Sequence, residues 1–550
     1  MSHAFYIWLT CLVQTFTPGI LSAAKINVLL IVSDDLRSSL EVKSPSLDQL
    51  ASKSAVFRNA FAQQAVCGPS RISFLTSRRP DTTRLYDFNS YWRVHAGNYT
   101  TLPQYFKSNG YTTMSVGKVF HPGEEVSFFC LCLFFFFFFF HTHTHTHTHT
   151  HVCKGQDGKL HANLLCAVNV SETPLGTLPD MESTAEAQRL LRTMKDAQSP
   201  FFLAVGYHKP HIPFRIPQEF LKLYPLENMT LAPDPDVPKG LPTVAYNPWV
   251  DIRMREDVQA LNVSFPYGPI PKDFQLQIRQ HYFAAVSYMD SELGKLLSTL
   301  DDLDLAKKTM VVFTSDHGWS LGEHGEWAKY SNFDVATRVP LIIYVPGVMT
   351  GDEVPGRKTF PFWDVFHHPH KRFPEGRAVK NVVELVDLFP TVSELAGLKP
   401  PPPCPRSSFA IQLCTEGSSR AGSIWVPEQK IDVEAIAYSQ YPRPSDTPQA
   451  NSDLPSLADI RVMGYSVRSY DYRFTLWVTF DPVSYTANLT DVHAGELYLL
   501  KDDPGQDHNI YDNVMHNAAS LKLGSQLPWT TALQQHLVYF SARSKPKAML

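Results

Sequence analysis

Two apolar segments that each end in acidic residues constrain the fold of this 550-residue chain most strongly. They are INVLLIV at 26–32, followed by Asp34 and Asp35, and TMVVFT at 309–314, followed by Asp316 and His317. Continuous apolar runs rich in β-branched residues are typical of central strands that are covered on both faces. In open α/β sheets, ligands bind beyond the carboxyl ends of such strands. The sequence therefore predicts an α/β fold with a site where these side chains converge.

Further segments extend the alternation of strands and helices. The stretch PFFLAVGYHKPH predicts a third buried strand over 200–211. Apolar residues at helical spacing predict three helices, over 46–52, 183–195 and 275–300. Alternating aromatic and polar residues over 460–500 predict an antiparallel sheet with one face in solvent.

The predicted domain boundary lies in a segment rich in Pro, Ser and Gly, from about residue 399 to 429. We expect a large N-terminal domain over 25–415, a linker over 416–431 and a smaller C-terminal domain over 432–550.

The N-terminus has the layout of a secretory signal peptide, which we place at 1–24. The apolar run AFYIWLTCLV is too short to span a membrane and is followed by small residues, although no Lys or Arg precedes it. The alternative is a buried N-terminal segment. Acceptor triplets for N-glycosylation agree with secretion. They begin at Asn98, Asn169, Asn228, Asn262 and Asn488.

An anomalous low-complexity insert occupies 124–151, where seven consecutive Phe residues precede a repeated His-Thr pair. In an extended chain the histidines would share one face and could bind a transition metal. The repeat also corresponds to a translated CA dinucleotide tract beside a T tract. We therefore interpret it as non-coding sequence or a retained intron, which a spliced transcript lacking the repeat would confirm.

The cysteines outside the leader and the insert are odd in number. Cys153 with Cys166, and Cys404 with Cys414, are close enough in sequence to close small loops, each worth about 3 kcal/mol through restriction of the unfolded chain. Cys67 is left over. A leftover thiol in a secreted protein is either buried and inert or reactive.

The acids at the strand ends predict a metal site. Three converging carboxylates repel one another unless a cation lies between them, and oxygen ligands favour a hard ion such as Ca²⁺ or Mg²⁺. His317 could ligate the ion or orient a bound oxygen. The alternative for each acid alone is a helix cap or a turn residue.

A net charge of −4 provides no global basic field, so we expect no nucleic-acid partner.

The pentad from Cys67 to Arg71, CGPSR, matches the Cys-x-Pro-x-Arg core of the type I sulfatases, and the chain resembles that family over most of 25–123 and 152–512. The resemblance implies an alkaline-phosphatase-like fold, with a large mixed sheet flanked by helices and a smaller C-terminal α+β domain built on an antiparallel sheet. It also implies a sulfuric ester hydrolase that reaches the lysosome through the secretory pathway, without stable membrane insertion.

The same resemblance implies a site. Cys67 would be oxidised to formylglycine (3-oxoalanine) by the formylglycine-generating enzyme, which reads Pro69 and Arg71. One hydroxyl of the hydrated aldehyde would attack sulfur, and the other would let sulfate leave by C–O cleavage. The implied ligands of one calcium ion are Asp34, Asp35, Cys67, Asp316 and His317. The implied catalytic residues are Cys67, Arg71, Lys118, His121, His208 and Lys329, and we favour His208 as the general acid.

The implied substrate is the 2-sulfate of iduronic acid at the ends of dermatan and heparan sulfate chains, and the implied sorting partner is the mannose 6-phosphate receptor. Two alternatives stay open: a sulfatase of other specificity, and a glycan-binding protein that has lost catalysis. A phosphodiesterase of the same superfamily with an unmodified nucleophile is a third rival, but it predicts Thr or Ser where Cys67 stands, so the sequence argues against it. Departures from the family pattern lie in the short segment after Asp35, in the insert and in the divergent tail over 513–550.

Overall fold

The computed structural model describes residues 25–38, 42–121, 151–155, 157–348, 356–369, 371–405, 409–425 and 431–513. The predicted leader, nearly all of the insert and nearly all of the divergent tail lie outside the described residues.

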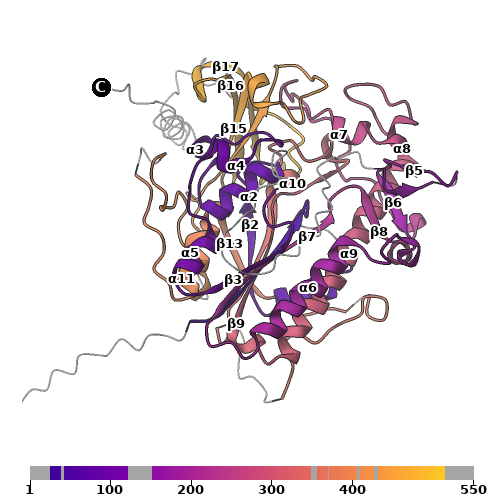
Figure 1. Cartoon of the computed structure of the whole chain (residues 1–550). Coiled ribbons are helices and arrows are strands. Elements are labelled where there is room, and N and C mark those ends of the chain that lie inside the picture. The colour runs from indigo at the N-terminus through magenta and orange to yellow at the C-terminus, as the bar shows by residue number, and fades with distance from the viewer. Residues whose placement is uncertain are drawn as a thin grey trace, which may run out of the picture.

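A seven-stranded mixed sheet forms the centre of the protein (Figure 1). Its strands, in order across the sheet, are β13 (Arg377–Glu384), β2 (Ala55–Phe61), β12 (Arg338–Tyr344), β9 (Thr309–Ser315), β1 (Asn27–Asp34), β7 (Phe201–Pro210) and β3 (Thr112–Gly117). Strand β12 runs antiparallel to both of its neighbours, and the other neighbouring pairs are parallel. The three buried strands expected from the sequence are β1, β7 and β9, so these predictions are confirmed.

Helices cover both faces of this sheet, as Figure 1 shows. On one side lie α1 (Pro45–Ser52), α6 (Pro179–Met194) and α9 (Lys272–Asp302), and on the other lie α2 (Cys67–Thr76), α5 (Leu102–Ser108) and α11 (Leu388–Leu395). Helices α1, α6 and α9 confirm the three helices predicted from apolar spacing, with ends that differ by a few residues.

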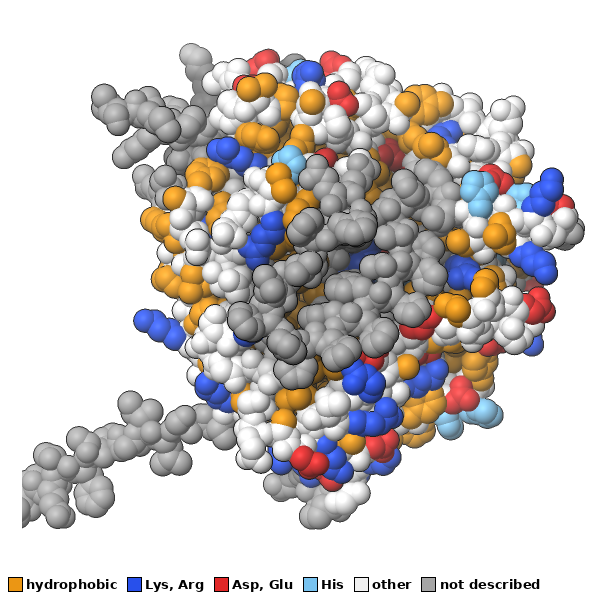
Figure 2. All heavy atoms as spheres, in the orientation of Figure 1, with side chains coloured by type: hydrophobic (Ala, Val, Ile, Leu, Met, Phe, Trp, Pro, Cys, Tyr) orange, Lys and Arg blue, Asp and Glu red, His pale blue; other side chains and the backbone are white. Residues whose placement is uncertain are grey.

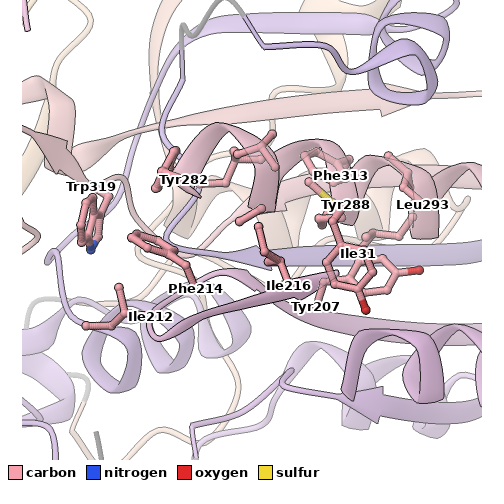
Figure 3. Close-up of a cluster of buried hydrophobic side chains, with 14 of the residues drawn as sticks. Ile31, Tyr207, Ile212, Phe214, Ile216, Tyr282, Tyr288, Leu293, Phe313 and Trp319 are labelled. Atoms are coloured by element: carbon pink, nitrogen blue, oxygen red, sulfur yellow. The ribbon is translucent and has the colours of Figure 1, made fainter. Parts of the chain in front are cut away.

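The side chains of β1 alternate between two hydrophobic cores. Leu29 and Ile31 join the core beneath α6 and α9, whereas Val28, Leu30 and Val32 join the core beneath α2 and α11. Figure 3 shows part of the first core, where aromatic side chains gather around Ile31. Because β1 is buried on both faces, its position is fixed, and the residues that follow it are held firmly.

A second, four-stranded antiparallel sheet lies against the first domain. Its order is β14 (Ala437–Arg443), β15 (Val462–Arg468), β16 (Tyr472–Asp481) and β17 (Thr486–Leu499). The antiparallel sheet expected over 460–500 is thus confirmed, but the expected solvent face is wrong for β15 and most of β16, which are buried throughout. Polar side chains of these strands have partners inside the protein. Arg473 of β16, for example, forms an ion pair of 2.9 Å with Glu496 of β17.

Short elements complete the described structure. The remaining α-helices of the described residues are α3 (Pro80–Thr83), α4 (Trp92–His95), α7 (Val250–Arg253), α8 (Glu256–Gln259), α10 (Asp334–Thr337) and α12 (Ala421–Trp425), and short 3-10 helices lie between the larger elements. The remaining strands are β4 (Cys153–Lys154), β5 (Leu160–His161), β6 (Leu165–Val168), β8 (Phe214–Pro217), β10 (Ser320–Leu321) and β11 (Trp327–Ala328). The described part of the expected linker packs on the first domain, where Arg420 forms an ion pair of 2.8 Å with Asp387.

Both predicted disulfides are present, Cys153–Cys166 and Cys404–Cys414. Cys67 is the free cysteine of the described residues, and it is buried. Cys67, the cysteine left without a predicted disulfide partner, therefore lies in the interior of the protein.

The surface agrees with the nearly balanced charge of the chain. On the face in Figure 2, Lys and Arg side chains are interspersed with Asp and Glu in the lower part of the view. The asparagines of the five acceptor triplets are all exposed. Among the described helices, none combines the length and the apolar character needed to cross a membrane.

Candidate active site

The acidic residues predicted at the strand ends lie together in the structure. Strands β1 and β9 are adjacent and parallel, with Ser33 opposite Ser315, so the residues after each strand emerge at the same edge of the sheet. Asp35 has a left-handed φ of 66°, and its backbone N donates to Asp316 Oδ1 at 3.1 Å. The buried strands thus deliver Asp34, Asp35 and Asp316 to one place.

Cys67 is the first residue of α2 and points its sulfur into this cluster. Its Sγ lies 3.2 Å from Lys329 Nζ, 3.4 Å from His317 Nε2, 3.5 Å from Asp34 Oδ1 and 3.6 Å from Lys118 Nζ. Burial raises the pKa of the Cys67 thiol, and the charge of Asp34 raises it further, while Lys118 acts in the opposite direction. An unmodified Cys67 is therefore held as a neutral thiol.

Arg71 links the two strand ends from the next turn of α2. Residues four apart share one face of a helix, so Arg71 reaches the same cluster as Cys67. Its Nε donates to Asp316 Oδ2 at 2.9 Å, and its Nη2 donates to Asp34 Oδ1 at 3.2 Å. All of these side chains are fully buried, so the guanidinium both orients the two carboxylates and offsets their charge.

Two lysines bring further positive charge from other parts of the fold. Lys118, just after β3, places Nζ 2.5 Å from Asp34 Oδ2, and Lys329, just after β11, places Nζ 2.9 Å from Asp35 Oδ1. Burial alone would lower the pKa of each lysine, but the neighbouring carboxylates, Asp34 for Lys118 and Asp35 for Lys329, raise it above its ordinary value. Both ammonium groups therefore stay charged.

The donor set fits a metal cation. The ligand atoms of Asp34, Cys67, Asp316 and His317 all lie within 4.8 Å of one another, as do those of a second set in which Asp35 and His211 replace Asp316 and His317. Asp35 Oδ2 is buried and has no hydrogen-bond partner among the described residues. Burial raises the pKa of Asp35 to about 7, so a further positive charge is needed to keep this carboxylate ionised at acidic pH. The carboxylate oxygens suit a hard ion.

The predicted histidines differ in their placement. His121 is partly buried and packs edge-to-face against Phe88 with ring centroids 4.3 Å apart, and its buried Nδ1 has no partner in the part of the chain that is described. His208 lies outside the cluster, with a side chain that is 39% exposed and Nδ1 3.3 Å from Asp180 Oδ1.

The structure also brings to the site His211, which was not among the residues predicted from the sequence. Its Nε2 lies 3.9 Å from Asp35 Oδ2. Its position in the sequence could have indicated this role. His211 comes directly after β7, just as the acids come at or directly after the ends of β1 and β9. Of the two histidines in the HKPH stretch, only His211, beyond the strand end, reaches the carboxylates of the site, because His208 pairs with Asp180 outside it.

Comparisons with known proteins identify the family of the chain. A model of the sulfatase family matches residues 26–398. The chain is 62% identical to iduronate 2-sulfatase of Mus musculus over 505 residues, covering 89% of this chain and 92% of that protein. It is 61% identical to iduronate 2-sulfatase of Homo sapiens over 502 residues, covering 89% and 91%.

A solved structure supports the same fold. A phosphonate monoester hydrolase from Silicibacter pomeroyi matches with a TM-score of 0.64 and 17% identity, covering 95% of this chain and 96% of that one. The chain belongs to the sulfatase family, and its predicted class, a sulfuric ester hydrolase with an α/β catalytic domain and a C-terminal antiparallel sheet, is confirmed.

Proposed function

We propose that this chain hydrolyses the 2-sulfate ester of iduronic acid at the ends of dermatan sulfate and heparan sulfate chains. One observation carries the substrate: relatives that are 61% and 62% identical over about nine-tenths of the chain are iduronate 2-sulfatases. The matched length covers about nine-tenths of both the chain and each relative, so the likeness is not confined to one domain.

The charges of the site support a sulfate ester as substrate. Lys118 and Lys329 contact the Cys67 sulfur, and Arg71 binds Asp316 beside it, so three positive side chains from different parts of the chain lie at this residue. A sulfate monoester carries one negative charge and further oxygens that accept hydrogen bonds, and guanidinium and ammonium groups are the donors that bind such anions. These three side chains would hold the sulfate group over residue 67 and offset the charge that develops on its oxygens.

The proposal includes one covalent modification and one bound metal ion. Cys67 would carry formylglycine, whose hydrated aldehyde supplies a hydroxyl nucleophile and a route for the release of sulfate. Asp34, Asp35, Asp316 and His317, together with residue 67, would hold one calcium ion, which lowers the pKa of a bound hydroxyl and polarises sulfate oxygens.

The residue that protonates the departing sugar oxygen is proposed to be His211 rather than His208. His211 faces Asp35 beside residue 67, whereas His208 is held by Asp180 and is partly in solvent. A general acid must lie within hydrogen-bond reach of the leaving oxygen, directly or through one water. His121 would contribute to the wall of the site near Gly68.

Cellular context is part of the proposal as well. The chain would pass through the secretory pathway, meet the formylglycine-generating enzyme there, and reach the lysosome through the mannose 6-phosphate receptor. Exposed asparagines in the acceptor triplets support the addition of glycans, because the transferred sugar needs an accessible side chain.

A turnover assay at acidic pH tests the substrate. Purified protein is offered oligosaccharides that end in 2-sulfated iduronate or in 6-sulfated glucosamine, and sulfate release is measured. We expect release from the first and little from the second. Release only from the second substrate contradicts the proposal, and release from neither by a protein with formylglycine at residue 67 also contradicts it.

A further inference from the structure

The backbone around Lys329 has a conformation that its own residues disfavour. Ala328 and Tyr330, on either side of the lysine, have φ values of 66° and 77°. Both carry a Cβ and both are buried. Residues with a Cβ persist in the left-handed region only where the surrounding structure imposes it. Lys329 is therefore presented to the site by a segment that depends on outside support.

Asn247 provides this support through its carboxamide. Its Nδ2 donates to the carbonyl oxygen of Trp327 at 3.0 Å and to that of Lys329 at 2.5 Å. Its Oδ1 accepts from the backbone N of Trp249 at 2.8 Å, and its own backbone N donates to Glu326 Oε1 at 2.8 Å. Asn247 is completely buried, so one side chain ties the lysine-bearing segment to the 247–249 loop.

A second support comes from the C-terminal sheet. Arg443 of β14 donates from Nη2 to the carbonyl oxygen of Tyr330 at 2.8 Å. The same guanidinium also binds the carbonyl oxygens of Val244 and Ser452, so it joins several loops at the domain junction. Asn247 is the more selective of the two, since its Nδ2 donates only to the segment that carries Lys329.

We infer that Asn247 is a positioning residue that fixes the Lys329 ammonium at the sulfate-binding site. This inference rests on the proposed function. A lysine side chain is flexible and its ammonium has no rigid fork of donors, so the location of Nζ depends on a fixed backbone and on packing. Without the carboxamide, two buried carbonyl groups lose their donor and the left-handed residues can relax, which moves Nζ away from Asp35 and Cys67.

A double-mutant cycle tests the inference, with the binding of inorganic sulfate measured by calorimetry as well as kcat/KM. We expect Asn247→Ala to weaken sulfate binding about tenfold when Lys329 is present and less than about twofold in the Lys329→Ala background, because the effect acts through the lysine. Equal losses in both backgrounds contradict the inference, as does a wild-type affinity in the single variant.

Controls separate positioning from folding. Asn332→Ala is a matched change of a buried asparagine nearby, whose Nδ2 donates to Gly464 O at 3.2 Å, and we expect it to leave sulfate binding unchanged. If Asn247→Ala does not fold, Asn247→Ser retains one donor and should show a smaller loss that again requires Lys329. A loss in Asn332→Ala equal to that in Asn247→Ala contradicts the inference.

The proposed substrate can be wrong while the inference about Asn247 is right. Turnover of another sulfate ester in place of 2-sulfated iduronate would overturn the substrate but not the sulfate-binding cycle. Wild-type affinity for sulfate in Lys329→Ala would overturn the role of the lysine and the inference together.

Discussion

Lys329 Nζ lies 3.2 Å from Cys67 Sγ, although 262 positions separate the two residues along the chain. The sulfur comes from the first residue of α2, and the ammonium comes from the segment after β11. A charged group beside the reacting atom needs no reorganisation during the reaction, which makes it effective in stabilising the transition state. Substitution of Lys329 should therefore be costly.

Lys329→Met keeps the length of the side chain and removes its charge. We expect kcat/KM for sulfate ester hydrolysis to fall roughly 100-fold or more, the usual cost of losing one donor that stabilises developing charge. Steady-state kinetics provide the measurement. Lys358→Met is the matched control, since Lys358 forms an exposed pair with Asp302 at 2.7 Å. Equal kcat/KM in the two variants would show that Lys329 does not act on the sulfate.

Substitution of each histidine in the HKPH stretch should separate their roles. His211→Asn is expected to lower kcat about 100-fold, within the range by which general acid catalysis accelerates a reaction, whereas His208→Asn should change it much less. The reason is placement, because only His211 faces the acidic cluster. The idea fails if the His208 variant is the more damaged, and a substrate with a better leaving group should restore much of the activity of the His211 variant.

Removal of calcium should abolish activity, and its return should restore it. Asp316→Asn is expected to weaken calcium binding about tenfold or more, since it removes a charged oxygen ligand. Titration calorimetry on protein treated with a chelator measures this affinity directly. Asp302→Asn, on the exposed end of α9, serves as the control. Unchanged calcium affinity in the Asp316 variant would exclude this carboxylate as a ligand.

The junction of the two domains should lose stability as pH rises. Burial raises the pKa of Asp234 to about 7, and the negative charges of Glu323 and Asp507 contribute. The unfolded carboxyl releases its proton near pH 4, about three pH units earlier, so between these values the folded state holds the extra proton. Stability from this group is therefore complete below about pH 4 and is lost as pH rises towards 7.

Asp234→Asn tests this dependence, because the amide cannot ionise. Melting temperatures are measured for both proteins at pH 5 and pH 7.5. We expect a smaller fall in the variant than in the wild type. An identical fall would mean that Asp234 is already ionised at pH 5.

Part of the fold and of the site follows directly from the sequence. Strand β1 could be predicted because its apolar run is continuous, and the acids after it could be assigned to the site because parallel strands end at one edge. Cys67 could be singled out because the other cysteines outside the leader and the insert form two short loops, and both disulfides are present.

Other features depend on contacts that no local pattern records. His208 and His211 are three residues apart, and the end of β7 decides which of them reaches the carboxylates. Asn247 has no sequence signal, since its role depends on carbonyl groups about 80 residues later in the chain. The polar residues of β15 and β16 suggested a solvent face, but Arg473 pairs with Glu496 in the interior.

Mass spectrometry of the peptide that contains residue 67, from protein made in cells with a secretory pathway, tests the central claim most directly. We predict that the peptide shows the mass loss of thiol-to-aldehyde conversion and that the modified fraction tracks the specific activity of each preparation. An intact Cys67 thiol in every molecule of a preparation that still releases sulfate would contradict the claim.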